Sequence, residues 1–429
     1  MRRALHAALL AAMLVRTVAT AAQTTPIDPR NGLTLEQAIA EGLSSEPALR
    51  AAAFEVEAAR GVARQAALRP NPGVSFEQRE QVGGMDRQTS IGVEWPLDLF
   101  SRGPRAEAAS RMVDVAEAAL QDRRRLLAAD IRRQYGDVLA AVRRLDLFDA
   151  VLAANGRTYD LLRNRVAEGA AAPLERDLAF VDLKRLEAGR ELAVGQVAIS
   201  LTKLKTLLGR APDAPLTLTD SLEDLVNAAA AQAFGAALPA ERGDVRQATA
   251  ELALARARSR QATQEGRPDL GLFAGYMRMD AGFPQLGLGS SGAPEPIQGV
   301  FHNAAVGLRL SIPLFNRGQG DIAAAKAREL NASEMVQARR LGASAEVAQA
   351  RARLDAARRT LAAYSGETRV VARRNLDVVR ETYTLGRATL FDVLNEQRRY
   401  LEFEGGYLDA LAETFSSQND LRRALGEGK

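Results

Sequence analysis

Two very long stretches of the chain repeat their apolar residues every seven positions. In the first stretch these positions hold Ile131, Val138, Leu145, Leu152, Tyr159 and Val166. In the second stretch they hold Val336, Ala343, Ala350, Ala357, Tyr364, Val371, Val378 and Leu385. A seven-residue apolar repeat marks the seam of a coiled coil. The helices predicted over 104–168 and 317–385 would each be about 100 Å long at a rise of about 1.5 Å per residue, which is too long for a compact domain.

Shorter helical stretches lie before and after each long one. Residues 33–68 and 173–208 flank the first long stretch, and residues 239–266 and 389–425 flank the second. Laid end to end, each pair of short stretches approaches the length of its long helix. Each half of the chain is therefore predicted to be a long helix with two short antiparallel helices stacked alongside it.

The two halves present the same features in the same order. A break at Pro96 precedes the first long helix, and a matching break at Pro313 precedes the second. This order predicts a duplicated chain, with a first repeat over 23–212, a linker over 213–238 and a second repeat over 239–429.

Each repeat contains one segment of alternating apolar and polar residues, which predicts a β-hairpin over 72–95 and another over 269–312. The part of the second hairpin from about 280 to 300 is rich in Gly, Pro and Ser and is predicted to be a loop. Strands of about 9–11 residues have the length that crosses an outer membrane at a tilt. Four strands cannot close a barrel, but three copies of the chain would supply twelve.

The first residues of the chain resemble an export signal. Arg2 and Arg3 precede an apolar run and then small residues, which predicts a cleaved signal peptide over 1–22. This segment carries three arginines and no acid, so its removal would lower the formal charge from +4 to +1. A nearly neutral chain gives no electrostatic reason to expect nucleic-acid binding. After residue 22 no apolar run is long enough for a transmembrane helix, so an exported chain would be periplasmic, secreted or an outer-membrane barrel.

Catalytic and metal-binding chemistry finds little support in the sequence. The chain has no cysteine, which excludes disulfides and thiolate metal sites, and His302 is the only histidine outside the predicted signal. No Ser-His-Asp arrangement or metal-ligand cluster can be built around it. We therefore expect no enzyme activity, no cofactor and no bound metal.

One segment carries a specific resemblance, from Tyr383-Thr-Leu-Gly386 through Asp392-Val-Leu-Asn395 to Gln397. Together with its weaker counterpart from Val166 to Glu175, it is similar to the periplasmic turns of the TolC-type outer-membrane factor family. The similarity covers nearly the whole chain after the signal. It implies a mainly α fold with a small β part: a trimeric α-barrel of long coiled-coil helices and a twelve-stranded transmembrane β-barrel, to which each chain gives two hairpins.

The resemblance also implies functional residues. Those expected to contact a periplasmic adaptor at the two turns, here called the tips, are Glu168, Gly169, Leu385, Gly386 and Arg387. Those expected to constrict the resting pore are Glu175, Tyr383, Asp392 and Asn395. The plainer alternatives are that the two glycines only cap helices and that Asp392 only favours the start of a helix.

The implied partners are two further copies of the chain, a periplasmic adaptor of the membrane-fusion type, an inner-membrane pump, preferably proton-driven, and outer-membrane lipid. The expected function is passive export of cargo that the pump selects. The Pro173-Leu174-Glu175 turn looks most like members that serve heavy-metal pumps, but organic drugs stay open as cargo. The alternative function is a soluble periplasmic coiled-coil adaptor or scaffold, which would leave the paired hairpins unexplained.

Overall fold

The computed structural model describes residues 26–83, 86–231 and 242–426, so the predicted signal segment lies outside the described residues. By contacts the chain divides into two compact units. We call Met1–Ser45, Asp130–Ala233 and Arg353–Asn419 the tip unit, and Glu46–Ala129, Phe234–Ala352 and Asp420–Lys429 the sheet unit. Each unit takes segments from both halves of the chain. The units are therefore not the two predicted repeats, and the duplication stays a prediction.

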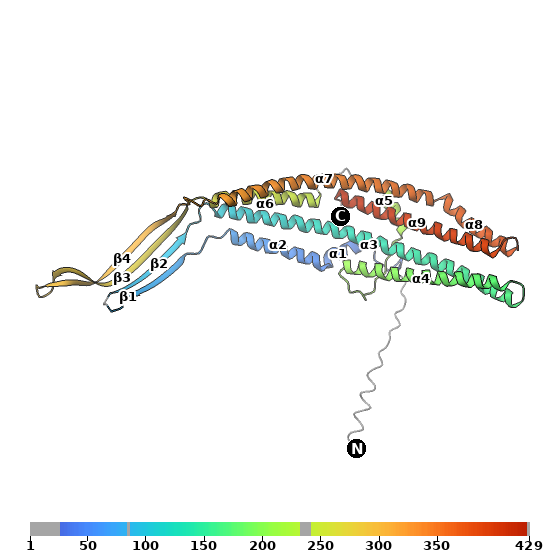
Figure 1. The fold of residues 1–429 in the computed structure, drawn as a ribbon, viewed down its shortest axis with the longest axis horizontal. Helices are drawn as coiled ribbons and strands as arrows, with labels where there is room; N and C mark the ends of the chain where they lie inside the picture. Colours follow the sequence, from blue (N-terminus) through green and yellow to red (C-terminus); the bar gives the residue numbers. More distant parts are fainter. Residues whose placement is uncertain (1–25, 84–85, 232–241, 427–429) are drawn as a thin grey trace, which may run out of the picture. The chain divides into compact units, whose positions relative to one another are not determined.

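The mainly helical fold with a small antiparallel β part is confirmed (Figure 1). The helices of the described residues are α1 (Leu35–Ser45), α2 (Pro47–Ala66), α3 (Arg102–Ala167), α4 (Pro173–Leu207), α5 (Leu222–Ala231), α6 (Gly243–Glu265), α7 (Gln319–Tyr364), α8 (Glu367–Thr384) and α9 (Leu390–Leu425). The strands are β1 (Gly73–Glu80), β2 (Arg87–Pro96), β3 (Asp269–Leu288) and β4 (Pro294–Ser311). The 66 residues of α3 form the long first helix that the seven-residue repeat predicts.

Three predicted elements differ from the structure. The helix predicted over 33–68 is divided at Glu46, because Pro47 begins a new helix at its first position, where proline's missing N–H is not needed. The helix predicted over 317–385 is divided at Gly366, whose positive φ of 66° a helix does not accept. The loop predicted over 280–300 is wrong, since β3 and β4 stay paired from Asp269↔Ser311 out to Leu288↔Pro294.

Ion pairs fix the order of helices in the sheet unit as α2–α3–α6–α7. Arg60 of α2 pairs with Glu117 of α3 at 2.7 Å, and Arg260 of α6 pairs with Glu107 of α3 at 2.5 Å. Arg256 of α6 contacts Glu329 of α7 at 3.6 Å. The helices thus form one layer, in which α2 and α7 are the outer members.

The four strands form an antiparallel sheet in the order β1-β2-β3-β4. Side chains alternate between the two faces of a strand, and the register places most of the exposed apolar residues on one face, here called the outward face. These residues are Val74, Phe76, Ile91, Val93, Leu272, Tyr276, Val306, Leu308 and Leu310. The other face carries an ion pair between Glu94 and Arg309 and several glycines, together with Phe273, Met277 and Ile297. The outward face is therefore the more suitable of the two for contact with lipid, because its exposed residues form an apolar belt.

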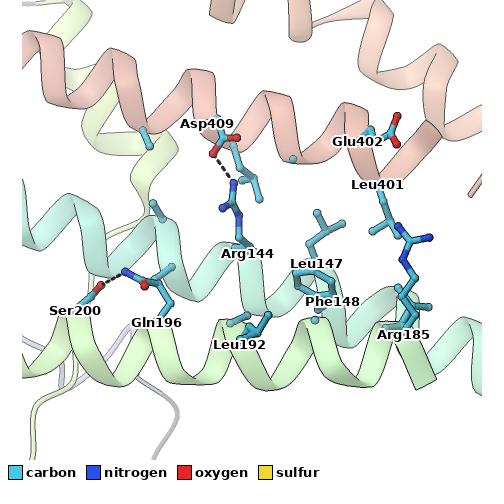
Figure 2. Close-up of a pocket in the computed structure, with 18 of the residues that line it drawn as sticks. Arg144, Leu147, Phe148, Arg185, Leu192, Gln196, Ser200, Leu401, Glu402 and Asp409 are labelled. Carbon is cyan, nitrogen blue, oxygen red and sulfur yellow. Dashed lines mark hydrogen bonds and ion pairs between the residues drawn. The ribbon is translucent and has the colours of Figure 1, made fainter. Parts of the chain in front are cut away.

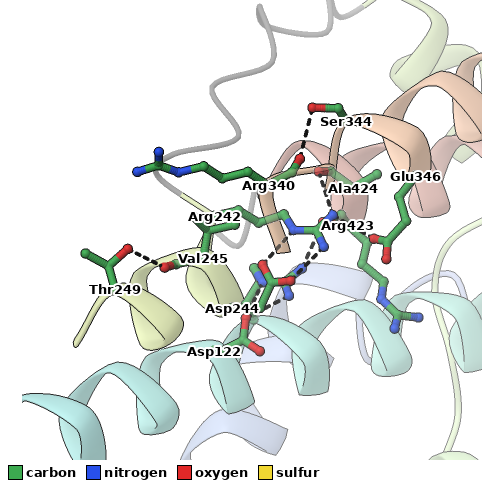
Figure 3. Close-up of polar contacts among 11 residues, drawn as sticks. Asp122, Arg242, Asp244, Val245, Thr249, Arg340, Ser344, Glu346, Arg423 and Ala424 are labelled. Carbon is green, nitrogen blue, oxygen red and sulfur yellow. Dashed lines mark hydrogen bonds and ion pairs between the residues drawn. The ribbon is translucent and has the colours of Figure 1, made fainter. Parts of the chain in front are cut away.

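A buried arginine holds the end of α9 in the sheet unit (Figure 3). The guanidinium of Arg242 is only 5% exposed and lies 2.7 Å from Asp244 and 2.6 Å from Glu346. It also donates to the carbonyl oxygen of Ala424, and Arg125 donates to that of Arg423 at 2.8 Å. The hydrogen bonds that Arg242 donates to Asp244, opposed by burial, raise the pKa of Arg242. We call these residues the Arg242 cluster; it satisfies carbonyls that a helix end leaves without partners.

Ion pairs order the helices of the tip unit as α4–α3–α9–α8. Arg190 of α4 pairs with Asp149 of α3 at 2.6 Å, and Arg144 of α3 pairs with Asp409 of α9. Arg369 of α8 pairs with the buried Glu404 of α9 at 2.9 Å. The tip unit therefore repeats the layer of the sheet unit, with α4 and α8 as its outer members.

The connecting segment between α4 and α5 is fixed to α3 by Tyr135. Its hydroxyl lies 2.8 Å from the carboxylate of Asp220 and 2.8 Å from the carbonyl oxygen of Leu33. Leu218 forms parallel bridges with Ile27 and Leu33. Burial raises the pKa of Tyr135, with a further contribution from Asp220.

Part of the predicted coiled-coil seam is confirmed. Ile131 and Val138 of α3 are fully buried, and α7 buries its repeat positions as far as Ala357. Beyond the break at Gly366 the seam changes, because Val378 is exposed. In α9 two seven-residue series are buried throughout: Leu390, Gln397, Glu404, Leu411 and Gln418, and Val393, Tyr400, Tyr407, Thr414 and Leu421. The first series contains three polar residues, and of the predicted apolar seam at Leu394, Leu401, Leu408 and Phe415 only the last two are buried.

Candidate functional site

The two tips have the same backbone geometry and lie at the same end of the tip unit (Figure 1). At the first tip the N–H of Gly169 bonds to Val166 and that of Ala170 to Arg165. At the second tip the N–H of Gly386 bonds to Tyr383 and that of the next residue to Thr382. This is the Schellman motif that closes a helix.

Positive φ angles of 73° at Gly169 and 71° at Gly386 explain why glycine occupies both positions. The interpretation of these glycines as helix caps is therefore confirmed, and their adaptor role stays a prediction. Glu168, Leu385 and Arg387 are exposed beside them, so a polar and an apolar contact are both available at the tips.

The structure brings two predicted gate residues together. The hydroxyl of Tyr383, at the end of α8, donates to the carboxylate of Glu175, in the first turn of α4, at 3.2 Å. The ring of Tyr383 packs against the buried residues Leu162 and Leu390. Burial and the charge of Glu175 raise the pKa of Tyr383. This hydrogen bond joins the α3–α4 hairpin to the α8–α9 hairpin directly behind the tips.

The other two predicted gate residues make different contacts. Asp392 accepts hydrogen bonds from the backbone N–H and the hydroxyl of Thr389, at 2.9 and 2.7 Å. In return the Thr389 hydroxyl accepts from the Asp392 N–H at 3.2 Å, which makes a capping box at the start of α9. The side-chain and backbone hydrogen bonds of Thr389 lower the pKa of Asp392, so its exposed carboxylate is charged. Asn395 is half-buried one turn further on.

A buried polar network that was not predicted from the sequence lies further from the tips. Asp182 of α4 accepts from Asn155 of α3 at 2.9 Å and from Gln397 of α9 at 3.4 Å. The side-chain oxygen of Gln397 also accepts from Arg380 of α8 at 3.4 Å. Burial lowers the pKa of Arg380. The seven-residue spacing of Gln397 from both Leu390 and Glu404 could have indicated that it is buried, but a polar residue was not expected in a buried seven-residue series.

A groove of 760 Å³ lies between α3, α4 and α9 within the tip unit (Figure 2). Its apolar lining includes Leu147, Phe148 and Leu192. The ion pair between Arg144 and Asp409 crosses it. Such a groove can accept apolar side chains and groups of either charge.

Neither a metal site nor a membrane-spanning helix is found in the described residues. No group of three or more His, Cys, Asp or Glu is placed to hold a metal ion there. Within the same ranges, no helix combines the length and the apolar character needed to cross a membrane. His302, the remaining candidate for acid–base chemistry, lies on β4 with its Nδ1 2.5 Å from the hydroxyl of Tyr276.

Curated relatives cover between 71% and 95% of the chain. It is 24% identical to the cobalt-zinc-cadmium resistance protein CzcC of Cupriavidus metallidurans, over 95% of this chain and 94% of the relative. It is 27% identical to the nickel-cobalt-cadmium resistance protein NccC of Alcaligenes xylosoxydans xylosoxydans, over 71% of this chain and 66% of the relative.

Solved structures show the same fold at low identity. CusC, from crystal structures that concern transmembrane channel formation, matches with a TM-score of 0.74 at 20% identity, over 92% of both chains. The open state of the MtrE outer membrane channel of Neisseria gonorrhoeae matches with a TM-score of 0.74 at 21% identity, over 94% of this chain and 90% of that one. The sequence model of the outer membrane efflux protein family matches residues 38–210 and 237–427. The chain therefore belongs to the outer membrane efflux protein family and is an outer-membrane efflux channel.

Proposed function

We propose that three copies of this chain form a passive export duct. In the proposed assembly each copy gives four strands to a twelve-stranded barrel in the outer membrane, and its helices continue as a tube in the periplasm. The duct has no catalytic activity of its own and conducts cargo that an inner-membrane pump delivers through a periplasmic adaptor. The family assignment and the outward apolar face of the sheet favour this function over a soluble adaptor or scaffold.

The observation that carries this proposal is the position of the exposed apolar side chains. Among the described helices they concentrate on the outer members of the two layers, α2 and α7 in the sheet unit and α4 and α8 in the tip unit. They are Phe54, Val62, Leu174, Leu178, Phe180, Val181, Leu192, Val194, Ile199, Leu330, Met335, Leu341, Val370 and Val378. The inner helices α3, α6 and α9 expose only Leu161 and Phe391 in this class. Large apolar surfaces are seldom left in water, so each layer is suited to continue into another copy.

The sheet is also suited to continue into another copy of the chain. Within the described strands, β1 and β4 each pair on one side only, so both edges keep unpaired N–H and C=O groups. An open edge cannot lie in lipid, because no water is available there to satisfy it. Pairing β4 of one copy with β1 of the next is a heterologous contact, and a ring of three such contacts would leave no edge.

For the resting pore we propose a constriction built from Glu175, Tyr383, Asp392 and Asn395. The 3.2 Å hydrogen bond between Tyr383 and Glu175 supports this because it ties the two hairpins of the tip unit together. Three copies of the charged Asp392 around one axis would attract cations and repel anions. The exposed tip residues Glu168, Leu385 and Arg387 and the groove of Figure 2 are the surfaces that we propose for the adaptor.

As cargo we propose divalent heavy-metal cations, since two curated relatives are metal-resistance proteins by name. A passive duct needs no metal site of its own, so this proposal does not require ligands along the wall. A pump driven by protons is the proposed source of energy. Organic drugs would be the cargo if the pump selects them.

The test is to purify the protein from outer membranes, determine the oligomer mass and record single-channel currents in planar bilayers. We expect a trimer with small, cation-preferring currents. Replacing Asp392 with Ala should raise the conductance and weaken block by multivalent cations, whereas the control variant Asp114→Ala, at a half-buried acid of α3 in the sheet unit, should change neither. A water-soluble monomer without current would refute the duct, and an unchanged Asp392→Ala channel would remove Asp392 from the constriction.

A further inference from the structure

On the outward face the apolar residues are followed by a row of polar residues, of which Gln78 already donates to Glu80 at 2.9 Å. The register places Gln78 opposite Thr89, Thr89 opposite Arg278, and Arg278 opposite His302. These four residues therefore lie side by side across all four strands, one step beyond the apolar residues Phe76, Ile91, Tyr276 and Ala304. We call Gln78, Thr89, Arg278 and His302 the donor row.

The hydrogen bond of His302 leaves one of its ring nitrogens available. The Tyr276 hydroxyl lies 2.5 Å from Nδ1 of His302, and the two rings stack with centroids 6.0 Å apart. When the tyrosine donates to Nδ1, a neutral imidazole carries its proton on Nε2. His302 can then donate from Nε2 to a group outside the protein, next to the guanidinium of Arg278.

Arg278 has no ion-pair partner among the residues that the structure describes. The acids closest in register on this face, Glu80 and Asp280, lie in the next row, where both are opposite Arg87. Arg87 contacts Glu80 at 3.8 Å. That row contains two carboxylates and one guanidinium, while the donor row contains one guanidinium and no carboxylate. By contrast, Arg309 on the opposite face has an ion-pair partner, Glu94.

The position of the donor row identifies the kind of anion that could bind there. An apolar belt runs along the outward face from Leu310 to Tyr276, and the donor row follows directly at its outer end. A charged side chain at the edge of an apolar belt lies at the level of lipid headgroups. A guanidinium matches the geometry of phosphate oxygens and can bind two of them at once.

We propose that the donor row binds the phosphate of a phosphorylated glycolipid in the outer leaflet of the membrane. Arg278 supplies the charge, and His302 and Thr89 supply further donors on either side of it. Tyr276 is the positioning residue, since its hydroxyl sets the tautomer of His302. The outward orientation of this face rests on the barrel in the proposed function.

The experiment measures lipid binding to the purified channel in mild detergent, by native mass spectrometry and by the temperature at which trimers dissociate. The probes are diphosphoryl lipid A, the same glycolipid without phosphates, and inorganic phosphate. The variants are Arg278→Gln and His302→Gln. The matched control is Arg79→Gln, an exposed arginine on the opposite face of β1.

We expect diphosphoryl lipid A to bind and to raise the dissociation temperature, and the phosphate-free glycolipid to do neither. Arg278→Gln should weaken binding about tenfold or more, because a charge-assisted bidentate contact is lost. His302→Gln should weaken it less, and Arg79→Gln should leave it unchanged.

Equal binding of both glycolipids, or wild-type binding by Arg278→Gln, would overturn the proposal. Inorganic phosphate binding as tightly as the lipid would also overturn it, since the site would then select a free anion. Single-channel currents from the same preparation distinguish a failure of this proposal from a failure of the duct. A trimer that conducts but does not bind lipid phosphate would refute the binding site at the donor row and leave the duct standing.

Discussion

The sheet unit and the tip unit share one helical layer but hold their buried polar groups differently. In the sheet unit the guanidinium of Arg242 is buried and bonded to two carboxylates at 2.6–2.7 Å. In the tip unit the two hairpins are joined by the hydrogen bonds of Tyr383 to Glu175 at 3.2 Å and of Gln397 to Asp182 at 3.4 Å, and by the exposed ion pair of Arg144 with Asp409. Hydrogen bonds of 3.2–3.4 Å are weaker than those of 2.6–2.7 Å, and the guanidinium of Arg242 is buried as well. We therefore expect the Arg242 cluster to be the permanent part of the molecule and the two long hydrogen bonds between the hairpins of the tip unit to be the joints that separate most easily.

The largest expected effect tests the permanent part. Replacing Arg242 with Ala removes the partner of Asp244 and Glu346 and leaves the carbonyl oxygen of Ala424, at the end of α9, without this donor. We expect the free energy of unfolding to fall by about 3–5 kcal/mol, because Arg242 is itself buried and the half-buried carboxylate of Asp244 is left without its partner. Denaturant unfolding followed by circular dichroism measures this loss.

The control for this variant is Arg256→Ala in the same unit. Arg256 is 56% exposed and lies 3.6 Å from Glu329, so its loss should cost less than about 1 kcal/mol. If the two variants were equally stable, the Arg242 cluster would be no more important than a surface pair, and the comparison between the units would fail.

A second prediction concerns the two faces of the sheet. Val306 is 84% exposed on the outward face, and the next residue, Ala305, points to the opposite face. Val306→Arg should destabilise the membrane-inserted protein by about 2–4 kcal/mol, because it brings a charge into contact with lipid. Ala305→Arg should cost much less, since that face carries charged residues already. Refolding into lipid vesicles measures both, and equal costs would contradict the assignment of the faces.

The helices and strands could largely be predicted because they depend on local patterns. The seven-residue repeat indicated α3, and the alternation on β4 from Ala304 to Leu310 indicated a strand. The loop predicted over 280–300 failed because its glycines and prolines suggested turns, whereas pairing between β3 and β4 determined the structure. Strand pairing overrides local propensity where a partner strand is available.

The candidate site was predicted unevenly for the same reason. Gly169 and Gly386 could be found because a helix end that needs a positive φ selects glycine locally. The contact between Tyr383 and Glu175 joins residues 208 positions apart, so only the family resemblance could suggest it. The burial of Gln397 and Glu404 was not predicted, because the buried seam of a coiled coil is expected to hold apolar residues.

The smallest expected effect tests the separable joint of the tip unit. Tyr383→Phe keeps the ring against Leu162 and Leu390 but removes the hydroxyl that donates a hydrogen bond to Glu175. We expect stability to fall by about 0.5–1.5 kcal/mol, as for one hydrogen bond of modest strength. The resting conductance should nevertheless rise, because this bond joins the two hairpins. Gel filtration should still show trimers.

The dependence on pH follows from the raised pKa of Tyr383, which burial and the charge of Glu175 cause. A group whose folded pKa lies above its unfolded value stabilises the fold fully below the unfolded pKa, about 10 for tyrosine, and loses that contribution as pH rises through the folded pKa. The wild-type conductance should therefore stay constant from pH 7 to about 9 and rise only above about pH 10. Tyr383→Phe should be open throughout and lack this alkaline rise. A variant that closes as tightly as the wild type, or that rises with it above pH 10, would show that the hairpins are held by other contacts, and the buried network around Gln397 would then be the joint that has to open.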